Sequence, residues 1–280
     1  MKKLTPVVAA LCVSLLAAQA GAADWKKIRI ATEGAYKPWN FTDSSGKLVG
    51  FELDLAADLC KRMGAECEIV AQAWDGIIPA LEAGKYDAIM AGMSITEKRK
   101  KVITFSRAYA ATPARFVALK SSPHGTFSTA METLTLDDVS AAEKADIDAI
   151  VKEFKGKTIG VQTSTTHENF LREYLGKDAD IKAYDTQENL DLDLQAGRVD
   201  VALASMSYWV PLLASDKGSD MVMVGPGMTG GPFGAGVGVG IRQKDADLAE
   251  KFSAAIDAAI KDGTASKLAV QWFGFDSSAK

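Results

Sequence analysis

Arg99 follows a run of small residues in the stretch AGMSITEKR, residues 91–99. A guanidinium group can bind a carboxylate through two parallel hydrogen bonds. The small residues Ala91 and Gly92 let a ligand approach the backbone closely. Thr96 is placed to cap the helix that carries Arg99, which favours an anion near that helix end. The alternative is an ordinary capped helix with a solvated arginine, and the spacing alone does not decide between the two.

Other polar and aromatic side chains also follow apolar runs. Glu33, beside Gly34, is a candidate anion for a ligand ammonium or guanidinium group. Tyr36 and Trp74 can clamp the flat or aliphatic part of a ligand, and a cation is favoured over an aromatic face. Taken singly, each ring is better explained as a core residue. The stretch VQTSTTH, residues 161–167, offers hydroxyl groups just before another predicted helix.

Residues typical of catalysis are scarce. The chain has 2 histidines and contains neither an HExxH nor a GxSxG motif. His167 can act as a general base, but a histidine beside threonines more often only forms hydrogen bonds. No metal-ligand cluster is evident, so we expect no metal and no cofactor. These features predict a binding module rather than an enzyme.

The glycine-rich run 225–240 invites a nucleotide-binding interpretation. A phosphate site requires such a run between a strand and a helix of a βαβ unit, and this context is missing here. We therefore interpret the run as a crossover between lobes, where glycines permit unusual backbone dihedrals.

The composition is that of an exported globular protein. The 280 residues are 48% hydrophobic and carry a net charge of −4, which excludes a strongly basic nucleic-acid binder. Residues 1–23 combine two lysines, an apolar run and small residues, as in a cleaved signal peptide. A membrane anchor is the alternative, but the apolar run is short for a span. Leu11 before Cys12 argues against a lipid anchor, so we expect a soluble protein outside the cytoplasm.

Cys60 and Cys67 are the cysteines that remain after the signal peptide. An even pair in an oxidising compartment favours a disulfide that joins a helix end to the next strand. Two buried thiols are the alternative.

Alternating strands and helices must position these residues. The pattern predicts strands over 28–34, 66–72 and 86–94, and helices over 51–64, 76–85 and 96–106. It restarts with strands over 157–165, 180–186 and 199–207, and helices over 166–176 and 187–198. Such alternation indicates open α/β sheets in two similar halves, whose ligands bind beyond the carboxyl ends of the strands. The long polar segment 121–155 has no assigned role.

The stretch GFELDLAADLCKRM, residues 50–63, resembles the signature of family 3 extracellular solute-binding proteins, the polar amino-acid receptors of ABC importers. ATEGAYKPWNF, SITEKRK, AGRVDVAL and WFGF also resemble that family, so the likeness spans about 28–275. Within it, the chain is similar to lysine/arginine/ornithine receptors and more so to octopine and nopaline receptors. The resemblance implies a type II periplasmic binding protein whose two lobes are joined by two crossing strands and close on the ligand. We expect lobe I to comprise 24–110 plus 232–280, and lobe II to comprise 111–231.

The resemblance also implies roles for individual residues. Glu33 matches the acid that meets a distal cationic group, and Tyr36 and Trp74 match the stacking rings. The α-carboxylate is matched by backbone and side-chain contacts from both halves: Ala91, Gly92, Ser94, Arg99 and Thr166. The implied protein is a periplasmic monomer that delivers its ligand to a membrane permease.

Ser205 departs from the family pattern, which usually has an aspartate there to neutralise the α-ammonium group. An ammonium facing serine would lose a charge-assisted partner, worth about 1.5–3 kcal/mol. An opine has a substituted amine and a second carboxylate, and Gln162 and His167 can bind the added arm. We therefore hypothesise an opine ligand. Free basic amino acids such as arginine, lysine, ornithine or histidine are the alternative, and a secreted dehydratase-like enzyme is the alternative of another class.

Overall fold

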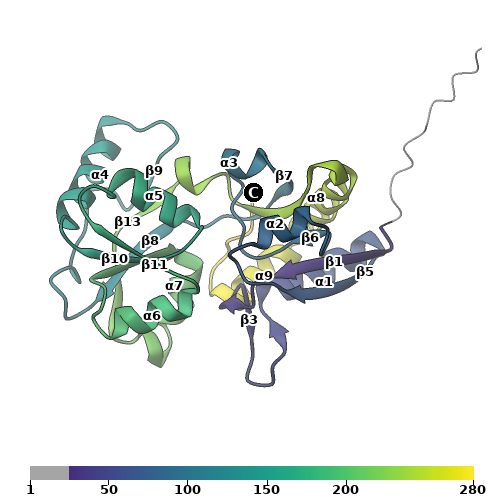
Figure 1. Cartoon of the computed structure of the whole chain (residues 1–280), viewed down its shortest axis with the longest axis horizontal. Coiled ribbons are helices and arrows are strands. Elements are labelled where there is room, and N and C mark those ends of the chain that lie inside the picture. Colours follow the sequence, from purple (N-terminus) through teal and green to yellow (C-terminus); the bar gives the residue numbers. More distant parts are fainter. Residues whose placement is uncertain (1–24) are drawn as a thin grey trace, which may run out of the picture.

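The chain folds into two lobes, each built around a β-sheet with helices on both faces (Figure 1). The computed structural model describes residues 25–280. The predicted signal peptide 1–23, including Cys12, lies outside the described residues. The expected fold class, a two-lobe type II binding-protein architecture, is confirmed.

Lobe I contains the sheet with strand order β5-β1-β6-β14-β7, in which β1 is parallel to β5 and β6. A small antiparallel sheet, β2-β3-β4, lies beside it. The elements of this lobe are β1 (Lys27–Thr32), β2 (Ala35–Tyr36), β3 (Asn40–Thr42), β4 (Leu48–Val49), α1 (Phe51–Met63), β5 (Glu66–Ala71), α2 (Ile77–Glu82), β6 (Ala88–Ile89), α3 (Glu97–Lys100), β7 (Ile103–Ala110), β14 (Val237–Arg242), the 3₁₀ turn η3 (Gln243–Asp245), α8 (Ala246–Lys261) and α9 (Thr264–Phe273).

Lobe II contains the sheet β11-β10-β12-β8-β13-β9, in which β10 is parallel to β11 and β12. Its elements are β8 (Ala114–Leu119), β9 (Thr133–Thr135), α4 (Ala141–Glu153), β10 (Thr158–Gln162), α5 (Thr166–Tyr174), β11 (Asp180–Tyr184), α6 (Gln187–Gln195), β12 (Val201–Ser205), α7 (Met206–Leu213), η1 (Asp216–Gly218) and β13 (Met221–Thr229). The 3₁₀ turn η2 (Gly231–Phe233) follows in the connection back to lobe I.

The chain passes between the sheets twice. Strand β7 leads into β8 through residues 111–113, and β13 leads into β14 through residues 230–236, which we call the second crossover. In lobe I, β14 is antiparallel to both β6 and β7. In lobe II, β8 is antiparallel to both β12 and β13. Both sheets therefore contain parallel and antiparallel pairs. The glycine-rich run predicted to be a crossover contains this second connection.

Helix α1 shows how the sequence pattern produces the packing. Phe51, Leu55 and Leu59 fall on one stripe and are buried against the sheet and α8. Gly64 ends the helix in the left-handed conformation, which favours glycine. Cys60, near that end, forms the predicted disulfide with Cys67 on β5, so this expectation is confirmed.

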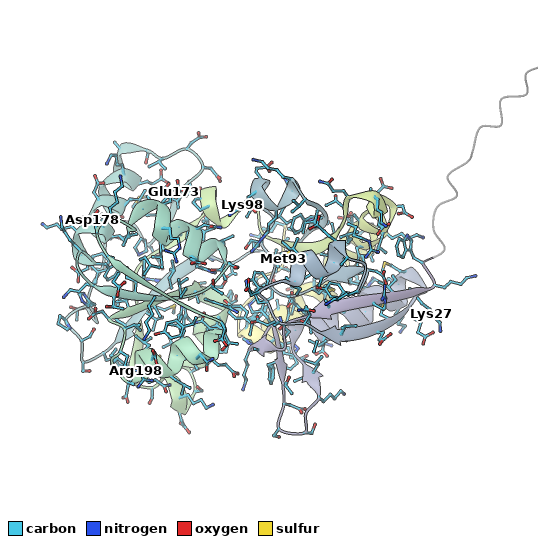
Figure 2. The ribbon with its side chains drawn as sticks, in the orientation of Figure 1. Lys27, Met93, Lys98, Glu173, Asp178 and Arg198 are labelled. Carbon is cyan, nitrogen blue, oxygen red and sulfur yellow. A yellow bond between two sulfur atoms is a disulfide. The ribbon has the colours of Figure 1, made fainter. Side chains whose placement is uncertain are left out.

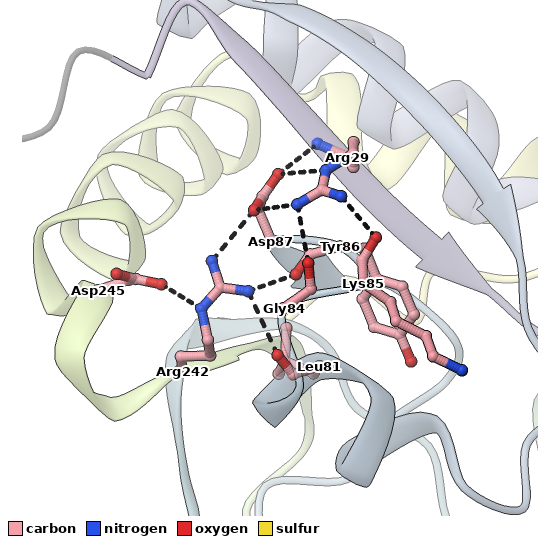
Figure 3. A network of polar contacts seen from close by, with 8 residues as sticks. All are labelled: Arg29, Leu81, Gly84, Lys85, Tyr86, Asp87, Arg242 and Asp245. Carbon is pink, nitrogen blue, oxygen red and sulfur yellow. Dashed lines mark hydrogen bonds and ion pairs between the residues drawn. The ribbon is translucent and has the colours of Figure 1, made fainter.

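A polar network links strands of lobe I (Figure 3). It includes Arg242, the last residue of β14, and so lies at the end of that strand away from the second crossover. Asp87 accepts hydrogen bonds from Arg29 on β1, at 3.0 Å and 3.1 Å, and from Arg242 on β14 at 3.0 Å. Burial opposes ionisation of Asp87, but the hydrogen bonds from the two arginines outweigh it and lower its pKa. Arg242 also binds Asp245, so one chain of charges links β1, β6 and β14.

The predicted helix over 96–106 is wrong in its second half. The helix, α3, ends at Lys100, and strand β7 starts at Ile103. Pairing with β14 overrides the local helical pattern because it joins the segment to the sheet. Within residues 25–280, no helix is both long enough and apolar enough to span a bilayer.

Candidate ligand-binding cleft

The structure brings every predicted ligand-binding residue to one cavity between the lobes. Further residues from both lobes and both crossovers complete its wall, among them Gln187 and Phe233. The predicted residues on this wall are Glu33, Tyr36, Trp74, Ala91, Gly92, Ser94, Arg99, Gln162, Thr166, His167 and Ser205.

Arg99 lies in the cavity wall without a carboxylate partner among the described residues. Its guanidinium donates to the carbonyl oxygens of Ser94, at 2.9 Å, and Ser164, at 3.4 Å. The Arg99 Cζ lies 5.2 Å from the centre of the Trp74 ring, within range of a cation–π contact. Burial lowers the pKa of Arg99 to about 10, so the group stays charged at neutral pH. It is therefore a partly buried cation whose remaining donors can bind an anion.

Glu33, at the end of β1, is a carboxylate without a cationic partner among residues 25–280. Its Oε1 accepts a hydrogen bond of 2.7 Å from Nε2 of Gln162, which belongs to lobe II. Burial, together with the neighbouring acids Glu52, Glu188 and Asp185, raises the pKa of Glu33 to about 7. A ligand cation at this position would supply the missing counter-charge.

The N-terminus of α5 provides a second anion-binding element. Thr165 caps the helix by accepting a hydrogen bond from the Glu168 amide, and it anchors itself to the Gln162 carbonyl at 2.7 Å. Thr166, the first residue of the helix, and His167 follow in the cavity wall. Amides of a first helical turn have no partner within the helix and favour anions. Helix α3, by contrast, has only 4 residues, so its end contributes little to an anion site.

His167 is a neutral side chain in this site. Burial and, to a smaller extent, the nearby charge of Arg99 together lower its pKa to about 4. Its ring packs on Phe233 of the second crossover, with centroids 5.7 Å apart. A neutral imidazole both donates and accepts hydrogen bonds, so it can bind a polar group without adding charge.

The two predicted rings have different surroundings. Trp74 is almost fully buried and donates a hydrogen bond of 3.1 Å to the carbonyl oxygen of Thr163. Tyr36 stacks on Tyr208 of lobe II, with centroids 4.8 Å apart. It also accepts hydrogen bonds from Ser205, while burial raises its pKa. One face of Tyr36 is therefore used by the protein itself.

Few charged residues line the cavity. Among the lining residues, Glu33 is the sole acid and Arg99 the sole permanently charged base, with His167 neutral beside it. Ser205 contributes a hydroxyl group at the carboxyl end of β12, where it starts α7. The lining therefore offers one partner for a ligand cation and one for a ligand anion.

Glu52 is a structural residue of the site that the sequence reasoning did not identify. This buried carboxylate at the start of α1 accepts hydrogen bonds from the Gly92 amide at 2.7 Å, the Asn40 amide at 2.6 Å and the Tyr109 hydroxyl. Asn40 in turn accepts a hydrogen bond from the Gly34 amide at 2.7 Å. Glu52 thus joins the two cavity loops of lobe I. The Gly92 amide proton is therefore used within lobe I, and the expected contact of Gly92 with a ligand stays a prediction.

The two lobes contact each other across the cleft. Trp39 donates to the Ser207 hydroxyl at 3.0 Å, and Ser164 and Asp75 bind at 3.2 Å. Ser164 adopts a left-handed backbone with φ of 59°, which is uncommon for a residue other than glycine. Such conformations cluster at binding sites because the surrounding contacts enforce them. No cluster of three or more potential metal ligands occurs within residues 25–280.

Comparison with known proteins agrees with this arrangement. Residues 28–275 match the model of the bacterial extracellular solute-binding proteins, family 3. The chain belongs to this family. A curated relative, the octopine-binding periplasmic protein of Rhizobium meliloti, is 42% identical over 285 residues, which cover 95% of this chain and 97% of the relative. The L-arginine-binding protein of Pseudomonas aeruginosa is 37% identical and covers 99% of this chain and 98% of the relative.

A solved structure of this family has the same architecture. It is a periplasmic His/Glu/Gln/Arg/opine family-binding protein from Silicibacter pomeroyi in complex with lysine. The TM-score is 0.72 at 33% identity, and the match covers 90% of this chain and 100% of the solved one. These named relatives are binding proteins rather than enzymes.

Proposed function

We propose that this family 3 protein is exported to the periplasm, binds an opine such as octopine in the cleft, and delivers it to the permease of an ABC importer. The observation that carries the ligand assignment is the balance of charges in the cavity, with one ionisable acid, Glu33, and one cation, Arg99. The similarity to an octopine-binding protein supports the same ligand class.

The charge balance distinguishes an opine from a free basic amino acid. Arginine carries two cationic groups and one carboxylate, so its α-ammonium would face Ser205 and find no acid in the cavity wall. Octopine carries a guanidinium group, a substituted ammonium and two carboxylates, and its second carboxylate balances its own ammonium. A cavity with one acid and one base therefore matches octopine in net charge and leaves an excess positive charge with arginine.

The ligand would lie with its charged groups against the unpaired residues. The guanidinium group binds Glu33, one carboxylate binds Arg99 and the amides at the start of α5, and the aliphatic chain packs against Trp74. Thr166 and Ser94 add hydrogen bonds to the first carboxylate. Gln162 and neutral His167 hold the second arm. We propose no covalent step, because Glu33 and His167 are better explained as ligand contacts.

Isothermal titration calorimetry with octopine, nopaline and arginine tests the ligand. An ammonium group without a charged partner costs about 1.5–3 kcal/mol, so we expect arginine to bind at least about tenfold more weakly than octopine. Tight binding of arginine alone would overturn the opine assignment. Agmatine, which lacks a carboxylate, should not bind measurably if Arg99 holds that group.

Ser205→Asp reverses the charge argument, and Ser205→Asn is its uncharged control of similar size. We expect the aspartate variant to gain affinity for arginine and to lose affinity for octopine, whereas the asparagine variant shifts neither by more than a few-fold. A gain in octopine affinity with Ser205→Asp would contradict the proposal. Recovery of unchanged octopine after long incubation with the protein separates binding from catalysis.

A further inference from the structure

The segment 121–140, the first part of the long polar excursion, packs along β13 up to the second crossover. Strand β9 pairs parallel with β13, so that Thr135 lies opposite Thr229. Backbone hydrogen bonds continue the contact on both sides, from the Gly225 amide to the Phe127 carbonyl at 2.9 Å and from the Leu136 amide to the Thr229 carbonyl at 2.8 Å. The segment therefore follows β13 as far as the residues that border the ligand cavity.

The segment is itself anchored to lobe II by buried carboxylates on α4. Asp146 accepts hydrogen bonds from the amides of Ala130, at 3.3 Å, and Met131, at 2.8 Å. Glu143 accepts one from the Thr135 amide at 3.0 Å and completes a capping box with Ser140. Because α4 packs in the core of lobe II, these contacts give the segment a fixed position from which it can act on its neighbour.

Asp137 is the residue through which the segment reaches the crossover. Its Oδ1 accepts a hydrogen bond of 2.8 Å from the Gly231 amide. The same carboxylate lies over Gly230 so closely that a β-carbon there would come within 2.4 Å of Oδ2. Gly230 has a φ of 68°, a backbone conformation that favours glycine. Asp137 does not line the ligand cavity.

The crossover passes this constraint on to the cavity. Gly231 begins the η2 turn, which ends at Phe233, and this ring packs on His167 and on Phe170 at 5.1 Å. Two residues further on, the Ala235 amide donates to the Ile95 carbonyl at 3.0 Å, next to Ser94.

A groove beside the crossover is lined by Asp137, by Lys98 of α3 and by Glu173 of α5. Lys98 of lobe I and Glu173 of lobe II, both labelled in Figure 2, lie on either side of the junction between the lobes, in the upper half of that view. Two hydrogen bonds fix the crossover between the lobes: the Gly231 amide donates to Asp137 in lobe II, and the Ala235 amide donates to Ile95 in lobe I.

We propose that the 121–140 segment is a buttress of the second crossover, and that Asp137 is a positioning residue that holds Phe233 against the ligand cavity through the Gly231 amide. This assignment concerns the unliganded protein and does not depend on octopine being the ligand. It gives the 121–140 segment a role in positioning a residue of the cavity wall without itself contacting the cavity.

Three variants test the proposal without any ligand. Asp137→Ala removes the acceptor, Asp137→Asn keeps an amide oxygen in its place, and Asp138→Ala is the matched control at the neighbouring exposed position. Amide hydrogen exchange followed by NMR should show the Gly231 amide exchanging at least about tenfold faster in Asp137→Ala, because a charge-assisted hydrogen bond is lost. Asp137→Asn should retain most of the protection, and Asp138→Ala all of it.

The ring protons of His167 report the position of Phe233. We expect their chemical shifts to move toward those of a free imidazole in Asp137→Ala and to stay unchanged in the other two variants, with melting temperatures similar to that of the parent protein. Unchanged exchange at Gly231 in Asp137→Ala would overturn the buttress. Faster exchange with unmoved His167 signals would overturn the positioning of Phe233.

Discussion

Ligand affinity should depend on pH through Glu33, in a direction that its burial dictates. Burial raises the pKa of the Glu33 carboxyl to about 7 in the unliganded protein. At pH 6 roughly nine-tenths of the molecules then carry it as a neutral acid, and at pH 8 roughly one-tenth do. A guanidinium group prefers the ionised form, so binding must release that proton at low pH. Octopine affinity should therefore rise about tenfold between pH 6 and pH 8, or about 1.4 kcal/mol.

Calorimetry in buffers with different ionisation enthalpies measures the proton release directly. At pH 7 we expect roughly half a proton to leave per ligand bound. The guanidinium group and the carboxylates of the ligand keep their charges over this range, so they do not contribute. Glu33→Gln should bind octopine more weakly and with no dependence on pH. Glu250→Gln, an exposed position on α8, is the matched control and should behave like the parent protein.

Two results would refute this reasoning. An octopine affinity that does not change between pH 6 and pH 8 would mean that Glu33 is already ionised before the ligand binds. Burial would then not raise the pKa of Glu33 in solution. An affinity that falls as pH rises would point to a protonated His167 binding an anion. The structure argues against the second outcome, because the pKa of His167 is lowered to about 4 and the ring stays neutral from pH 6 to pH 8.

Three further substitutions test other parts of the structure. Arg99→Lys loses the two parallel hydrogen bonds to a carboxylate, so octopine affinity should fall about 10- to 100-fold with the fold intact, and calorimetry showing less than a threefold change would be inconsistent with the clamp. Asp87→Asn removes the carboxylate that binds Arg29 and one of the two carboxylates that bind Arg242, and should reduce the free energy of unfolding in urea at pH 7 by about 1.5–3 kcal/mol. The folded-state pKa of Asp87 is lowered, so the parent protein loses this contribution to its stability as pH falls through that pKa. The difference in unfolding free energy between the parent protein and Asp87→Asn should therefore narrow in acid. A difference that does not change with pH would exclude the charge of Asp87 as its cause. Replacing Cys60 and Cys67 with serine opens a loop of sequence separation 7 and should destabilise the protein by about 2–3 kcal/mol without changing octopine affinity; an equal melting temperature would contradict this.

The parts of the fold with strong local signals were predictable from the sequence. Helix α1 has its apolar stripe and a glycine at its end, and the predicted 51–64 differs from the observed Phe51–Met63 by one residue. Strand β7 was missed because residues 103–106 continue a helical pattern locally, and only pairing with the distant β14 makes them a strand. Helix α7 was missed for a related reason, since it follows β12 without a turn and contains Pro211.

The candidate site was predictable where residues lie at strand ends. Glu33, Trp74 and Arg99 follow apolar runs, and parallel strands bring their carboxyl ends to one edge. Gln187 and Phe233 reach the cavity from the start of α6 and from the second crossover, and their contribution depends on how the lobes face each other. The role of Glu52 depends on long-range hydrogen bonds to Gly92 and Tyr109, which no local pattern encodes.

The central claim is that a cavity with one acid and one base selects a ligand of matching charge. Native mass spectrometry tests this claim most directly, with the protein mixed with equimolar octopine and arginine. The account predicts that the complex with octopine dominates the spectrum and that Arg99→Ala removes it. A spectrum dominated by the complex with arginine, or an octopine complex that persists in Arg99→Ala, would contradict the account.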